Sequence, residues 1–269
     1  MKILTMKFGG TSVADVDRMR AVRDIISDEV RDGWNVVAVV SAMSKETNKL
    51  IDLAKQVGVE NLVDPEYDSL ISTGEDVSSS LLAIALNSIE VSSRSWRGWQ
   101  LPIRTDSFHS NAKIEEIKTN QIINSFKEGV KVAVVSGFQG MEQAGRITTL
   151  GRGGSDTSAV AIAAAIDAER CDIYTDVSGI YTTDPRIKRN ASKLKKISFE
   201  EMLEMASLGA NVLQTRAVEL AMRHKVPIRV LNSFLKEEGT LVCDEEEIME
   251  KNIVSVSYTH LTLPTNREV

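Results

Sequence analysis

The chain has 269 residues, 42% of them hydrophobic, and a formal net charge of −6 at pH 7. This length can bury a substantial core in one large domain, and the acidic balance argues against a nucleic-acid partner, because phosphate backbones are bound by basic surfaces. No apolar run reaches the ~20 residues that span a membrane, and the N-terminus lacks the apolar segment of a signal peptide. Cys171 and Cys243 fit no metal-binding spacing, so we expect buried free thiols in a reduced, cytoplasmic protein.

Short apolar runs alternate with stretches of helical periodicity along the chain. Strands are predicted at 2–8, 36–40, 131–135, 171–174 and 228–231. Helices are predicted at 13–32, 47–57, 66–88, 113–128, 156–168, 198–206 and 212–224. Ser198 and Glu201 form a predicted capping box, and the polar segment 141–146 predicts a hairpin between Phe138 and Ile147. The alternation predicts an α/β protein with a mainly parallel sheet covered by helices on both faces.

The first predicted strand leads into a pair of glycines. Lys7 lies at the carboxyl end of this strand, and Gly9 and Gly10 follow before a helix begins. In open α/β sheets, ligands bind at that edge. The spacing is not that of a Walker A loop, and a lone lysine is more often a solvated surface residue.

A second glycine-rich loop follows the hairpin. Arg152 stands among Gly151, Gly153 and Gly154, and a run of alanines then predicts a helix with Ser155 and Asp156 as N-caps. The N-terminus of a helix suits an anion, because its N–H groups are unpaired and its dipole is positive there. Arg152 adds a planar fork that matches a carboxylate or a phosphate. A plain turn before a buried helix is the simpler interpretation, but the arginine among glycines favours a ligand site.

Together these segments resemble the aspartokinases of the amino-acid kinase family. The resemblance extends from about residue 2 to about residue 254, and its motifs are 7–12, 39–42, 72–75, 98–100, 137–140, 148–156 and 174–186. It implies a three-layer αβα sandwich that transfers the γ-phosphoryl group of ATP to the β-carboxylate of L-aspartate. It also implies Mg²⁺, bound chiefly by ATP phosphates and water. A carboxylate nucleophile is already ionised at pH 7, so catalysis requires positioning and charge neutralisation rather than a general base.

The resemblance implies two catalytic residues. Lys7 is expected to stabilise the transition state, and the aspartate that matches Asp156 orients this lysine or engages magnesium, although it could also be a plain N-cap. Arg152 is expected to hold a carboxylate of aspartate. Glu75 is expected to hold its ammonium group, but could instead serve only the helix dipole. The implied substrate-binding residues are Ser41, Thr47, Glu75, Arg152 and Ser155. The implied nucleotide-binding residues are Lys7, Gly9, Gly10, Thr175, Asp176, Tyr181, Arg186 and Asn211.

Three features depart from the family pattern. Asn211 stands where many relatives carry a lysine that touches ATP, which puts nucleotide affinity in doubt. Residues 1–254 are expected to form the catalytic domain, and 255–269 read as a non-native or disordered tail. The C-terminal ACT regulatory modules of the family are not recognisable, so we expect the homodimer to be weakened or absent.

Two alternatives remain open. One is a sibling amino-acid kinase with another acidic substrate, and the other is a truncated, non-catalytic nucleotide-binding fragment. The motif 72–75 argues against the first, and the presence of Lys7, Arg152 and Asp156 argues against the second.

Overall fold

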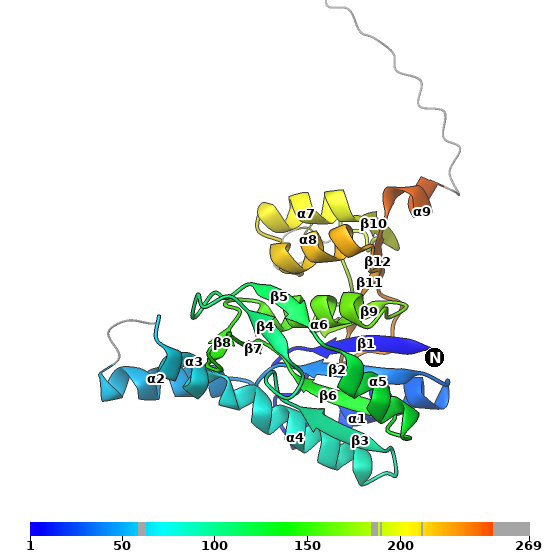
Figure 1. The fold of residues 1–269 in the computed structure, drawn as a ribbon. Coiled ribbons are helices and arrows are strands. Elements are labelled where there is room, and N and C mark those ends of the chain that lie inside the picture. Colours follow the sequence, from blue (N-terminus) through cyan, green and yellow to red (C-terminus); the bar gives the residue numbers. More distant parts are fainter. Residues whose placement is uncertain (59–62, 184–187, 189, 211, 250–269) are drawn as a thin grey trace, which may run out of the picture.

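The computed structural model describes residues 1–58, 63–183, 188, 190–210 and 212–249 (Figure 1). Its centre is an eight-stranded sheet in the order β10-β12-β11-β9-β1-β2-β6-β3, in which only β11 and β12 are antiparallel neighbours. The strands of this sheet are β1 Ile3–Phe8, β2 Asn35–Val40, β3 Ser93–Trp96, β6 Val132–Ser136, β9 Cys171–Thr175, β10 Lys196–Ser198, β11 Ile228–Asn232 and β12 Thr240–Cys243. A smaller sheet in the order β5-β4-β7-β8 contains β4 Ile103–Thr105, β5 Ile114–Ile117, β7 Gln139–Met141 and β8 Ile147–Thr149.

Helices cover both faces of the large sheet (Figure 1). One face packs against α1 Val16–Arg31 and α4 Thr73–Asn87. The other packs against α5 Asn120–Lys127, α6 Gly154–Ala165, α7 Phe199–Ser207 and α8 Thr215–His224. The remaining helices are α2 Glu46–Val57, α3 Pro65–Ile71 and α9 Glu245–Met249. The predicted α/β sandwich is therefore confirmed.

The packing of β2 shows why the sequences of the buried strands are mostly apolar. In β2, Val37 and Val39 belong to the core on one face, whereas Val36, Ala38 and Val40 belong to the core on the other. Successive side chains of a strand point to opposite faces, so a strand with helices on both sides favours apolar residues on both of its faces. This pattern identified β1, β2, β6, β9 and β11 from sequence.

Two predicted helices are wrong in part. The segment predicted as a helix over 66–88 forms α3 and α4, with Ser72 as the C-cap of one and the N-cap of the other. The segment predicted as a helix over 113–128 begins instead with β5, and α5 starts only at Asn120. Ile114 and Ile117 have helical spacing, but antiparallel pairing with β4 decides their structure. The short strands β3, β4, β10 and β12 were not predicted.

Three local predictions are confirmed. Ser198 and Glu201 form the capping box of α7, and β7 and β8 form the predicted hairpin. Cys171 and Cys243 are buried free thiols. The structure describes no helix that is long and apolar enough to cross a membrane.

Candidate active site

The parallel strands bring the candidate residues to one edge of the sheet. In the register, Phe8 is aligned with Val40 on one side and with Tyr174 on the other. The carboxyl ends of β1, β2 and β9 therefore lie side by side, as the sequence predicted. Lys7, Ser41 and Thr175 stand at or just after these ends.

Lys7 and Asp156 form an ion pair at this edge. The Lys7 Nζ lies 2.6 Å from Asp156 Oδ1, and the two side chains are 13% and 10% exposed. The contact is close but poorly aligned for a hydrogen bond, and Asp156 Oδ1 has no hydrogen-bond partner. Gly9 lies beside the pair, because a Cβ at Gly9 would stand 3.4 Å from the Lys7 Nζ. The lysine is thus a partly buried cation held by one carboxylate next to the glycine loop, not a solvated surface residue.

The start of α6 differs from its prediction. Gly153, with φ +69°, is the N-cap, while Ser155 and Asp156 lie in the first turn and do not cap the helix. A Cβ at Gly153 would lie 1.9 Å from Gln214 Cγ, so the left-handed backbone and the close approach of Gln214 both require glycine. The Ser155 Oγ instead lies against the end of β6, 2.9 Å from where a Cβ of Gly137 would stand. The side chains of Ser155 and Asp156 therefore do not serve the helix terminus.

Glu75 is a buried carboxyl in the first turn of α4. Its Oε1 accepts a hydrogen bond of 3.0 Å from the Ala42 backbone N, and its Oε2 is buried without a hydrogen-bond partner. Burial raises the pKa of Glu75 to about 8, since the charged form is poorly solvated there. A Cβ on Gly10 would lie 3.0 Å from Ala42 O, and one on Gly74 would lie 2.8 Å from Ala42 Cβ. The segment after β2 therefore joins the Gly9–Gly10 loop to Glu75.

Arg152 and Thr47 come from segments that flank this group. Arg152 is exposed between Gly151, with φ +76°, and Gly153, and it forms no ion pair with another described residue. Thr47 lies half-buried in the first turn of α2. Among the described residues, no hydrogen bond or ion pair joins the side chain of Arg152 or Thr47 to Lys7 or Glu75.

Three of the predicted nucleotide residues, Thr175, Asp176 and Tyr181, lie at or after the end of β9. The Thr175 Oγ1 donates to Asp176 Oδ1 at 3.2 Å, and the Asp176 side chain is exposed. The Ser233 Oγ donates to Thr175 O at 3.1 Å and accepts from Ser12 Oγ at 2.9 Å, which ties the loop after β11 to the loop after β1. Tyr181 is half-buried and pairs with Lys193 in an isolated bridge.

Two predicted nucleotide residues, Arg186 and Asn211, lie outside the described residues.

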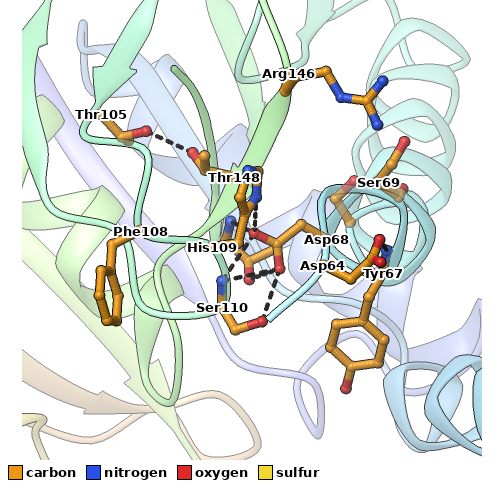
Figure 2. A network of polar contacts seen from close by, with 12 residues as sticks. Asp64, Tyr67, Asp68, Ser69, Thr105, Phe108, His109, Ser110, Arg146 and Thr148 are labelled. Atoms are coloured by element: carbon orange, nitrogen blue, oxygen red, sulfur yellow. Dashed lines mark hydrogen bonds and ion pairs between the residues drawn. The ribbon is translucent and has the colours of Figure 1, made fainter. Parts of the chain in front are cut away.

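Sequence reasoning missed two acidic residues behind the site. Asp76 Oδ1 accepts from Ser136 Oγ at 2.9 Å and from Gln139 Nε2 at 3.1 Å, and its Oδ2 lies 3.2 Å from Arg97 Nε. Asp68 is fully buried in α3 and accepts hydrogen bonds from segments far along the chain (Figure 2). One signal in the sequence could have found Asp68. It lies three residues before the apolar Ile71, a spacing that puts both residues on the buried face of a helix, where an acidic side chain is unusual.

The part of the chain that the structure describes contains no group of three or more His, Cys, Asp or Glu residues arranged to hold a metal ion.

A parallel sheet with a lysine–aspartate ion pair and a helix N-terminus at its carboxyl edge is an arrangement in which α/β proteins bind anionic ligands. The profile of the amino acid kinase family matches residues 2–232, so the chain belongs to that family.

Its relatives include named aspartate kinases. The chain is 54% identical over 256 residues to "Aspartate kinase Ask_LysC" of Stutzerimonas stutzeri, covering 95% of this chain and 62% of that protein. It is 50% identical over 254 residues to an aspartokinase of Geobacillus stearothermophilus, covering 94% of this chain and 62% of that protein. The chain thus spans about 62% of the length of these curated relatives.

Solved structures give the same picture. Aspartate kinase from Synechocystis has a TM-score of 0.80 and 45% identity, covering 90% of this chain and 40% of that chain. E. coli aspartokinase III in complex with aspartate and ADP also has a TM-score of 0.80, at 32% identity, covering 90% of this chain and 65% of that chain.

Proposed function

We propose that the chain is the catalytic part of an aspartate kinase, which transfers the γ-phosphoryl group of ATP to the β-carboxylate of L-aspartate and forms 4-phospho-L-aspartate. The observation that carries the proposal is the Lys7–Asp156 pair at the sheet edge. The relatives named as aspartate kinases, one of them solved with aspartate and ADP, support the choice of substrates. The reaction is the entry step of a lysine, threonine and methionine branch of amino-acid biosynthesis.

In this reaction one β-carboxylate oxygen attacks the γ-phosphorus, and the bond from that phosphorus to the bridging oxygen of ADP breaks. Negative charge grows on the transferred group and on the leaving oxygen, so the chief demand is for a fixed cation. Lys7 supplies it, and Asp156 holds the ammonium group in place. The N–H group of Gly10 would be offered to the phosphates, whereas the N–H group of Gly9 donates to Tyr174 O at 3.4 Å and would have to leave this bond to contact them.

Other residues at the sheet edge would recognise L-aspartate. Glu75 would bind the α-ammonium group of aspartate through its unpartnered Oε2. Arg152 would bind a carboxylate with its guanidinium fork, while Ser41, Thr47 and Ser155 would line the pocket. Thr175, Asp176 and Tyr181 would contact the nucleoside, together with Arg186 and Asn211.

Mg²⁺ would accompany ATP. Asp156 Oδ1, which lies 2.6 Å from the Lys7 Nζ, is an oxygen of the kind that magnesium favours, and no other protein ligand is required when phosphates and water fill the shell. The ion would neutralise phosphate charge. We further propose a cytoplasmic location and no nucleic-acid or membrane partner.

The test is ADP release with Mg-ATP and a panel of acceptors: L-aspartate, L-glutamate, N-acetyl-L-glutamate, carbamate and UMP. The proposal expects release that depends on L-aspartate and is lost in Lys7→Ala. Release with another acceptor would show a sibling kinase. Binding of ATP without release for any acceptor would show a non-catalytic nucleotide-binding fragment.

A further inference from the structure

The carboxylate of Asp68 is the junction of three segments that are distant in sequence (Figure 2). Asp68 lies in α3 and is fully buried. Its Oδ2 accepts from the backbone N of Ser110 and of Thr149, both at 2.9 Å, and lies 3.0 Å from His109 Nδ1. Its Oδ1 accepts from Thr149 Oγ1 at 2.7 Å and from Ser110 Oγ at 3.2 Å. A buried carboxylate with this many donors fixes the segments that supply them.

The first consequence concerns the loop that carries Arg152. Thr149 ends β8, and Leu150 and Gly151 lead directly to Arg152. A Cβ on Gly151 would lie 3.0 Å from Ser110 O. The segment around Ser110, which hydrogen bonds to Asp68, therefore also packs against this loop. On the other side, Arg216 Nη1 donates to Leu150 O at 2.8 Å. The loop is thus held at its base from two sides, while the Arg152 side chain remains exposed.

The second consequence concerns Glu75. The helix α3 continues into α4 through Ser72, whose backbone N donates to Asp68 O at 3.1 Å. Glu75 lies in the first turn of α4, two helical turns beyond Asp68. Asp68 is therefore connected to Glu75 through α3 and α4, and to Arg152 through its hydrogen bonds to Thr149.

We propose that Asp68 is a positioning residue that sets the spacing between Glu75 and Arg152, and so the fit of an acidic amino acid between them. Asp68 does not touch substrate, since it is fully buried. The assignment of the two residues to an amino-acid substrate rests on the proposed function, whereas the positioning of the 148–153 segment does not.

The test compares Asp68→Asn with Asp64→Ala. Asparagine keeps the shape of Asp68 and can still accept from the backbone N–H groups, but it lacks the charge and one acceptor oxygen. Asp64 caps the same helix, through Oδ1 contacts of 2.6 Å to Glu66 N and 3.3 Å to Tyr67 N, and makes no contact with the Arg152 loop. Its loss weakens α3 without touching the junction.

Two readouts are taken for both variants in the 269-residue chain. The first is KM for L-aspartate and for ATP. Asp68→Asn should raise KM for L-aspartate roughly tenfold, because hydrogen bonds to a charged group are of that strength, and leave KM for ATP within about twofold. The second is hydrogen–deuterium exchange in the free protein, which should accelerate in peptides covering 148–153. Asp64→Ala should lower Tm and change neither readout.

Equal rises in both KM values in Asp68→Asn would overturn the proposal, as would the same exchange in 148–153 for both variants. If the parent chain releases no ADP with L-aspartate, the proposed function fails, and the exchange comparison alone then decides whether Asp68 holds the loop.

Discussion

Glu75→Gln should remove a loss of unfolding free energy that the unliganded protein suffers as the pH rises. Burial raises the pKa of Glu75 from 4.5 to about 8. The folded state therefore keeps the proton up to about pH 8, whereas the unfolded chain releases it near pH 4.5. Protonation favours the folded state, so the stability that this group contributes is present at low pH and is lost as the pH rises through this window. Glutamine is the closest match to the protonated carboxyl and cannot ionise.

The magnitude follows from the width of this window. At about 1.4 kcal/mol per pH unit, the full shift is worth at most about 5 kcal/mol, and relaxation of the site with water entry reduces it. Between pH 5 and pH 8 we expect the parent protein to lose about 2–4 kcal/mol of unfolding free energy relative to Glu75→Gln.

The assay is urea unfolding of both proteins at pH 5, 6, 7 and 8, without substrate. Using the difference between the two proteins cancels the titration of all other groups. A constant difference across the four pH values would refute the assignment of Glu75 as a carboxyl that is neutral in the free protein. If it is correct, binding of an ammonium group must ionise Glu75, so KM for L-aspartate should fall between pH 6.5 and pH 8.

Three further substitutions test separate parts of the site. Lys7→Ala should lower kcat by roughly 100-fold or more with little change in Tm, because the transition-state cation is lost; a kcat within a few-fold of the parent would contradict this role. Arg152→Ala should weaken the binding of L-aspartate by about 1.5–3 kcal/mol, the range for a charge-assisted hydrogen bond; a change in KM for ATP alone would contradict the role of Arg152 in binding aspartate. Asn211→Lys should tighten Mg-ATP binding by up to about 1 kcal/mol, the upper range for one added ion pair; an unchanged or higher KM for ATP would count against the expectation from sequence.

The parts of the fold that the sequence predicted are those decided by local pattern. The apolar runs of β1, β2 and β9 gave the sheet, and the topology then required Lys7, Ser41 and Thr175 to share an edge. The glycine-rich segment was recognised, but its cap was assigned to Ser155 and Asp156. The position of Gly153 as N-cap depends on Gln214, which approaches from α8 and is 61 residues away in sequence.

What the sequence did not show depends on long-range contacts. Asp68 reads as an ordinary helical acid, and only its donors at 109–110 and 149 reveal its role. Likewise, Ile114 and Ile117 have the spacing of a helix and become β5 because β4 is available to pair with them. The burial of Glu75, and with it the raised pKa, follows from the packing of Gly10 and Gly74 against Ala42, which no local pattern encodes.

The most direct test of the central claim is the identity of the product. The chain would be incubated with Mg-ATP, L-aspartate and hydroxylamine, which converts an acyl phosphate into a stable hydroxamate, and the product would be identified by mass spectrometry. The account predicts β-aspartyl hydroxamate in amounts equal to the ADP formed, and at least about 100-fold less over the same interval with Lys7→Ala. ADP formed without the hydroxamate, or hydroxamate formed equally by the variant, would contradict it.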